Sequence, residues 1–214
     1  MSSVIKTNTI SEVTSANGVT IDGVSLKDGQ VPASAGSSLV LLKSGTPSGA
    51  DTGTTYDDFY SSDYDVYLVT ANTLRSTADN TDMSFKLIDS SGSVLATSNY
   101  DYNIVGRTSA GAAWGWSAEG GSGGFALNPY NLGNAGGESL SFTMWMYGFS
   151  NTDADTTYNG TLGFGHKDND DLVTATIGGR FTTEATVMRG LKFFLTGTGG
   201  FRGTGTIQIY GLKK

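Results

Sequence analysis

A glycine-rich segment near the middle of the chain contains the pattern of a serine nucleophile. Residues Gly120–Gly124 match G-x-S-x-G, which in hydrolases places the serine on a tight turn between a strand and a helix. No helical pattern follows, because Asn128 and Pro129 interrupt the segment, and the only histidine is His166. The same glycines match G-x-G-x-x-A, but without the strand and helix that a dinucleotide site needs. We therefore expect a chain that is not an enzyme.

Acidic side chains gather in predicted turns, where their oxygens could hold a cation. The run from Lys167 to Leu172 is similar to half of a calcium loop, with carboxylates at Asp168, Asp170 and Asp171. It lacks the glycine and the glutamate that an EF-hand has at its sixth and twelfth positions. A solvated hairpin turn explains the same residues. We predict no cofactor and no bound metal, and keep these three aspartates as the candidates for a surface cation.

Two groups of aromatic residues are candidates for a surface that binds a ligand or a partner. Tyr60, Tyr64 and Tyr67 belong to a tyrosine-rich band, and Trp114 and Trp116 lie in a glycine-rich stretch. Tyrosine and tryptophan bring a large contact area at a small cost in side-chain entropy, which suits binding surfaces. Packing in the core or between subunits is the alternative interpretation.

The composition predicts an all-β protein. Gly, Ser and Thr make up 83 of the 214 residues, and only 15% of residues are charged. Glycine and the β-branched and small polar residues are poorer helix formers than Ala or Leu. The chain still holds 3 Trp, 10 Tyr and 10 Phe, which is enough to build a core.

The same figures exclude several classes of protein. With no cysteine, the chain has neither a disulfide framework nor a cysteine-based metal or redox site. No apolar run approaches the roughly 18 residues of a membrane span, and the polar start predicts no secretory signal. A net charge of −7 argues against nucleic-acid binding, which needs a basic surface. We expect no nucleic-acid partner and no membrane insertion.

The first 31 residues differ from the rest of the chain, because they contain no aromatic residue. Apolar residues alternate with polar ones at Val19, Ile21, Val24 and Leu26, and turn signals follow each short stretch. Strands this short cannot stand alone, so they need another chain or surface to cover them. We predict an extended β N-terminal arm over residues 1–31 that anchors or trimerises the protein. A floppy arm is the alternative.

The rest of the chain is predicted to form a linker and a β-sandwich. Residues 32–38 are small, polar and proline-led, as domain boundaries are. Residues 39–214 show many short strands with no helical pattern between them, which indicates an antiparallel, jelly-roll-like β-sandwich. Residues 43–55 and 109–137 are predicted to be loops. The predicted strands cover residues 39–42, 64–70, 83–88, 94–96, 100–105, 140–149, 161–166, 172–177, 191–195 and 206–212.

Two segments resemble parts of tailed-phage virion proteins. Residues 10–29, Ile-Ser-Glu-Val-Thr-Ser-Ala-Asn-Gly-Val-Thr-Ile-Asp-Gly-Val-Ser-Leu-Lys-Asp-Gly, resemble an element that recurs in tail-fibre and related structural proteins, especially of phages of marine bacteria. Residues 203–213, which end in Tyr-Gly-Leu-Lys, are similar to the way many of these proteins end. The resemblance covers about 31 of the 214 residues. It implies a virion component, commonly trimeric, with a β-structured body.

We therefore expect a non-enzymatic bacteriophage structural protein on the virion surface, either a capsid decoration or cement protein or a short tail-fibre component. It would be a homotrimer, contact other capsid or tail proteins through its arm, and assemble in the host bacterial cytoplasm, with which the lack of cysteine agrees. The alternative is a host-receptor or carbohydrate-binding module of a tail fibre that binds a host surface glycan. A polysaccharide depolymerase is a third hypothesis, which the lack of a long internal repeat disfavours.

Overall fold

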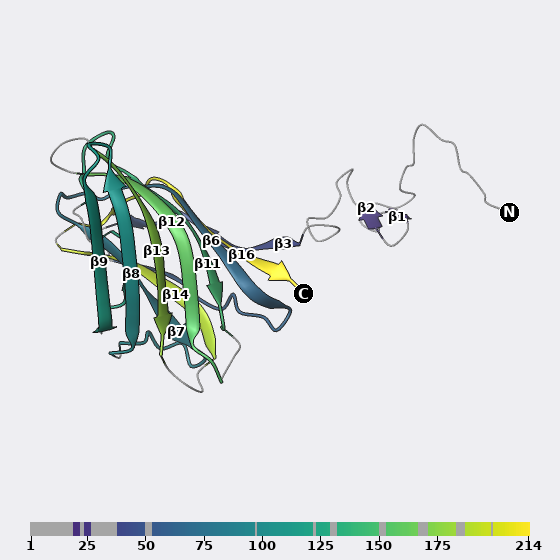
Figure 1. Cartoon of the computed structure of the whole chain (residues 1–214). Helices are drawn as coiled ribbons and strands as arrows, with labels where there is room; N and C mark the ends of the chain where they lie inside the picture. The colour runs from purple at the N-terminus through teal and green to yellow at the C-terminus, as the bar shows by residue number, and fades with distance from the viewer. Residues whose placement is uncertain are drawn as a thin grey trace. The chain divides into compact units, whose positions relative to one another are not determined.

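The computed structural model of the chain contains β-strands and no helix in the part that it describes (Figure 1). The described residues are 19–21, 24–26, 38–49, 53–96, 98–121, 123–128, 132–149, 153–166, 171–182, 187–197 and 199–214. The chain divides into two compact units, residues 1–40 and 41–214. The prediction of an all-β, antiparallel protein is confirmed.

The N-terminal unit contains a short antiparallel pair, β1 (Val19–Ile21) and β2 (Val24–Leu26). Val19 lies opposite Leu26, and Ile21 lies opposite Val24. The four residues predicted to anchor the protein therefore pair with one another, while their anchoring role stays a prediction. The predicted linker covers residues 32–38, of which all but Ser38 lie outside the described residues.

An eight-stranded sheet forms the larger layer of the second unit (Figure 1). Every pairing for which the register is defined in this sheet is antiparallel. Its strands lie in the order β3 (Leu39–Gly45), β16 (Thr206–Lys213), β6 (Tyr64–Leu74), β11 (Leu140–Tyr147), β12 (Thr156–Gly165), β13 (Leu172–Phe181), β8 (Tyr100–Thr108) and β9 (Ala113–Gly121).

A four-stranded antiparallel sheet forms the second layer. Its strands lie in the order β10 (Phe125–Ala126), β7 (Asp82–Asp89), β14 (Met188–Thr196) and β5 (Gly53–Tyr56). A separate two-stranded pair joins β4 (Ser48–Gly49) to β15 (Phe201–Arg202).

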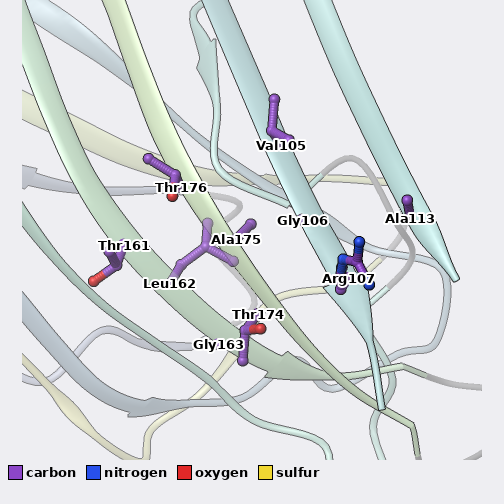
Figure 2. Close-up of a pocket in the computed structure, with 10 residues that line it drawn as sticks. All are labelled: Val105, Gly106, Arg107, Ala113, Thr161, Leu162, Gly163, Thr174, Ala175 and Thr176. Atoms are coloured by element: carbon purple, nitrogen blue, oxygen red, sulfur yellow. The ribbon is translucent and has the colours of Figure 1, made fainter. Parts of the chain in front are cut away.

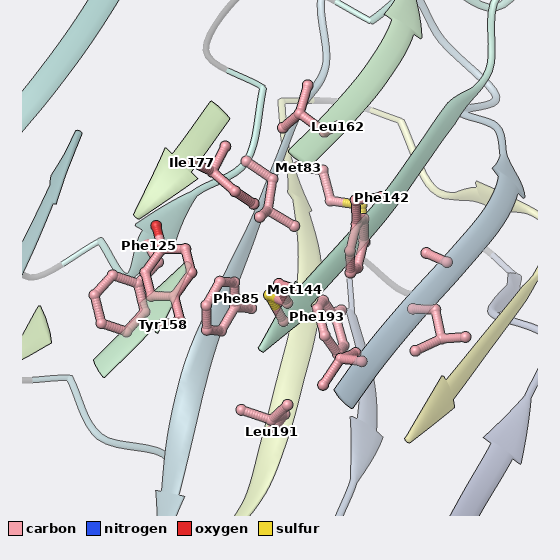
Figure 3. Packing of buried hydrophobic residues seen from close by; sticks show 14 of the residues in the cluster. Met83, Phe85, Phe125, Phe142, Met144, Tyr158, Leu162, Ile177, Leu191 and Phe193 are labelled. Carbon is pink, nitrogen blue, oxygen red and sulfur yellow. The ribbon is translucent and has the colours of Figure 1, made fainter. Parts of the chain in front are cut away.

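Aromatic rings hold the two sheets together (Figure 3). Phe85 on β7 contacts Tyr158 on β12, with ring centroids 5.2 Å apart, and Phe193 on β14 lies 5.9 Å from Phe142 on β11. Phe125 on β10 also packs edge-on against Tyr158, at 4.7 Å. Such pairs add to the free energy gained by burying the rings. The sheets therefore face each other across one core, as in a β-sandwich.

Strand alternation explains which side chains enter this core. On β11 the side chains of Leu140, Phe142, Met144 and Met146 are buried, and the residues between them point to the other face. The strand predicted over residues 140–149 is therefore confirmed for Leu140–Tyr147, with its two-residue period, and ends two residues earlier than predicted.

The two predicted loops are each partly strand. Residues 109–137 contain β9 and β10, and residues 43–55 contain the end of β3, all of β4 and the start of β5. Glycines pointed to loops in both places. In β9, however, they lie on an edge strand that pairs along most of its length with β8.

Candidate binding face

The eight-stranded sheet has one face in the core and one that no described strand covers, which we call the outer face. Side chains of directly paired residues point to the same side of a sheet. On β11, Trp145 lies between the fully buried Met144 and Met146, so its side chain belongs to the outer face. Direct pairings place five further residues in one row with Trp145, and therefore on the outer face. They are Tyr210, Leu68, Asn159, Gly178 and Asn103.

Large side chains occupy the half of the outer face over β16, β6 and β11. All of them are half-buried, and none belongs to the buried core. We call this group the apolar strip; it consists of Val66, Leu68, Trp145, Tyr147, Tyr210 and Leu212. A monomer seldom exposes a contiguous apolar patch without a role in binding.

Small, uncharged side chains predominate on the adjacent strands β12, β13 and β8, and the larger Val105 and Arg107 of β8 lie beside them. We call this group the polar floor; it consists of Asn103, Thr157, Asn159, Thr161, Gly163, Thr174, Thr176 and Gly178. Thr161 is the centre of a threonine ladder, since it lies opposite Thr143 on one side and Thr176 on the other. The outer face therefore changes, within one strand spacing, from large aromatic groups to hydroxyls, amides and bare backbone.

The polar floor is hollowed because its side chains are short. One hollow of about 700 Å³ lies over β12, β13, β8 and the start of β9, between Thr161, Thr174 and Val105 (Figure 2). Another, of about 460 Å³, is lined by residues that include Asn103 and Gly178. These depressions follow one another along the floor and give the face room for an extended ligand.

An ion pair closes one end of the floor. Arg180 on β13 donates from Nε to Oδ2 of Asp101 on β8 at 3.0 Å. Asp101 also accepts a hydrogen bond from the backbone N–H of Gly120, at 2.8 Å. The bond from Gly120 and the bond from Arg180 lower the pKa of the Asp101 carboxyl. Because the pair is exposed, we expect it to orient these strands more than to stabilise them.

The structure corrects the prediction for Tyr67, which is fully buried and offers no surface to a ligand. Its ring packs 5.0 Å from Phe149 and 5.4 Å from Phe59, and its hydroxyl donates to the carbonyl of Ser61. Tyr60 and Tyr64 are half-buried and pack against the core. The tyrosine band is therefore mainly a packing feature.

Trp114 and Trp116 lie on β9 and face the same side of the sheet as buried Ile104, which is opposite Trp116. Trp116 is 50% exposed and donates from Nε1 to the Tyr102 hydroxyl at 3.3 Å, whereas Trp114 packs against the core. Five strand spacings, about 24 Å, separate β9 from β6. The tyrosines and tryptophans therefore do not form one surface.

The predicted cation candidates are only partly within the described residues. Asp168 and Asp170 lie outside them. Asp171 accepts a hydrogen bond from the Ser109 hydroxyl at 2.9 Å. Among the residues that the structure describes, no three His, Asp or Glu side chains are grouped as a metal site.

Trp145, Tyr147 and Tyr210 were not among the predicted site residues. The signal for the first two is the alternation over residues 140–149, which places both opposite the core-facing side chains. Only the register with β6 and β16 adds Tyr210 to them.

The fold and this face define a β-sandwich with one wide sheet surface that no described strand covers. No protein-family model, curated protein or solved structure matches the chain. In the described part of the chain there is no helix that is long and apolar enough to span a bilayer.

Proposed function

We propose that the chain is a non-enzymatic structural protein of a tailed-phage virion, displayed on the particle surface as a capsid decoration protein or a short tail-fibre component. The observation that carries this proposal is the division into a unit with a hairpin of three-residue strands and a large β-sandwich. Such a hairpin buries too little apolar surface to be stable alone, so it gains stability from another surface. The resemblance of residues 10–29 to virion proteins supports the same role.

In this proposal the N-terminal unit is the attachment segment. Its apolar residues Val19, Ile21, Val24 and Leu26 meet copies of themselves in a homotrimer, or a capsid or tail protein. Assembly takes place in the cytoplasm of the host bacterium. The β-sandwich is the part that the particle displays.

Replacing Val19, Ile21, Val24 and Leu26 together by serine is expected to abolish trimerisation and incorporation into phage particles. Light scattering should give one third of the mass of the wild-type assembly. The matched control replaces Thr20 and Ser25, which pair in the same hairpin, by alanine, and should leave both properties unchanged. Circular dichroism checks that the β-sandwich stays folded. A serine variant that remains trimeric and particle-bound would contradict the proposal.

A second candidate function, favoured by the outer face, is saccharide binding. A sugar ring has apolar C–H faces and a rim of hydroxyls, which need an aromatic surface next to hydrogen-bonding groups. Trp145 lies directly opposite Asn159, at the boundary between the apolar strip and the polar floor. The side chains of the polar floor are neutral, and the charged groups beside it, Arg107 and the Arg180–Asp101 pair, lie at its two ends, so the floor suits a neutral saccharide chain.

Replacing Trp145 by alanine is expected to weaken binding to neutral oligosaccharides on a glycan array about tenfold, the effect of losing roughly 1.4 kcal/mol of stacking. Trp116→Ala is the matched control, since Trp116 is also exposed but belongs to the opposite face. If binding depends on Trp116 and not on Trp145, the saccharide site lies at β9 and not on the outer face. Absence of binding to any glycan by the wild-type protein would reject this second function.

A further inference from the structure

Strand β9 is the longest uncovered edge of the two sheets. Within the described sheet it has a neighbour, β8, on one side only. The edges of the four-stranded sheet are short, with two residues in β10 and four in β5, and the other edge of the large sheet, β3, carries Lys43. Natural proteins protect edge strands by shortness, charge or proline. Strand β9 has no proline, and its one charged residue, Glu119, follows an uncharged run of six residues from Ala113 to Ala118.

The hydrogen-bond pattern identifies which backbone groups of β9 face outward. The N–H of Thr108 donates to the carbonyl of Ala112 at 3.0 Å and closes the turn between β8 and β9. In an antiparallel pair, hydrogen-bonded and non-bonded positions alternate from such a point. Trp114 and Trp116 therefore bond to β8. The N–H and C=O groups of Ala113, Gly115 and Ser117 point to the uncovered side.

The side chains at these positions allow another strand to approach. The three residues with outward backbone groups are small, so nothing bulky flanks the edge. Trp116 stands beside them on the core side of the sheet and is 50% exposed. A strand added here would gain backbone hydrogen bonds and would cover part of that ring.

We propose that β9 pairs with β9 of a second copy of this chain, antiparallel about a two-fold axis at Ser117. This register places the outward positions opposite one another, which antiparallel pairing requires. It also places each Trp116 opposite the Ala118 of the other copy, a large side chain beside a small one. Registers centred on Gly115 or Trp116 bring tryptophans face to face. The contact is isologous, so it closes as a dimer.

This contact is independent of the proposed virion role and of the N-terminal unit. It joins two β-sandwiches through a continuous sheet of sixteen strands, twice the eight of one copy. The polar floors of the two copies then lie on the same surface, on either side of the axis.

A cysteine at position 117 tests the contact, because the chain has no cysteine of its own and any disulfide joins two chains. In the full chain, Ser117→Cys is expected to form a disulfide-linked dimer at least ten times faster than Thr161→Cys. The control residue Thr161 is also exposed, but lies in the middle of the outer face. Paired Cα atoms in an antiparallel ladder are 4.5–5.5 Å apart, which a disulfide can span.

A second variant keeps the test independent of cysteine chemistry. Ser117→Lys adds a charge at the uncovered edge and is expected to halve the mass of the wild-type assembly in light scattering, with the β-sandwich still folded by circular dichroism. Equal cross-linking rates for the two cysteine variants, or a wild-type mass that Ser117→Lys leaves unchanged, would overturn the proposal.

Discussion

Raising the pH from 10 to 12 is expected to unfold the protein cooperatively, because burial raises the pKa of three tyrosines to about 12. These are Tyr56, Tyr67 and Tyr100, which are at most 6% exposed. In the unfolded chain a tyrosine ionises near pH 10. The stability that the neutral phenols contribute is therefore complete below pH 10 and is lost as the pH rises towards 12.

The size of the effect follows from the shift. Two pKa units correspond to about 2.7 kcal/mol for each group, and the three together to about 8 kcal/mol. A typical domain has about 5–15 kcal/mol of stability in total, and this loss is comparable with that total.

Hydrogen bonds add to the cost of ionising these phenols. The Tyr100 hydroxyl donates to the carbonyl of Leu95 at 2.9 Å, and the Tyr56 hydroxyl donates to the carbonyl of Gly45 at 3.0 Å. A phenolate can donate neither bond. It would also leave a charge among the aromatic rings of the core.

Tyrosinate absorbance and circular dichroism, followed together against pH, measure this transition. We expect both to change in one step above pH 10. Burial raises the pKa of Tyr158 as well, so Tyr100→Phe should remove about a quarter of the pH-dependent loss. If the buried tyrosines ionise while the circular dichroism of the β-sheets is unchanged, the core tolerates phenolate and the prediction is wrong.

Replacing Gly160 by alanine is expected to destabilise the protein by about 3 kcal/mol or more. Gly160 lies in the middle of β12, opposite Met144. An added Cβ would overlap the carbonyl oxygen of Thr143 and lie 2.7 Å from the Cα of Met144. Both are backbone atoms of β11, so no rotation of a side chain relieves the clash. The two central strands must separate, which costs more than the usual 1–3 kcal/mol of overpacking.

Gly163 on the same strand is the matched control. There the nearest atom to an added Cβ is the carbonyl oxygen of Val173, at 3.7 Å, which is ordinary contact. Gly163→Ala should stay within about 0.5 kcal/mol of the wild type. Urea denaturation at neutral pH compares the two midpoints. Equal midpoints would mean that β11 and β12 can move apart at little cost.

The sequence predicted the strands whose two faces differ in size or polarity, but it did not say which face enters the core when both are large. Residues 64–70 show this. Val66 and Leu68 alternate with Tyr67 and Val69, and either pair could be buried. The second sheet decides, because it packs on the side of Tyr67 and Val69. Tyr67 is therefore a core residue, although the tyrosine-rich band alone makes it a candidate for a surface.

The binding face depends on pairings between distant residues, which local patterns do not contain. Trp145 meets Leu68 on one side and Asn159 on the other, and Tyr210 joins the row from near the end of the sequence. In β9, nine residues of Ala, Gly, Ser, Trp and Glu have no strand signal of their own. They form a strand because they pair with β8.

The position of β16 has a consequence for biosynthesis. This strand lies between β3 and β6, although it follows β6 by more than 130 residues along the chain. During translation, the edge of β6 that pairs with β16 in the folded protein has no native partner until residues 206–213 have been made. Pairings of such long range fold slowly, and an unpaired strand edge is prone to aggregate. The nascent chain therefore needs protection for this edge through most of its synthesis.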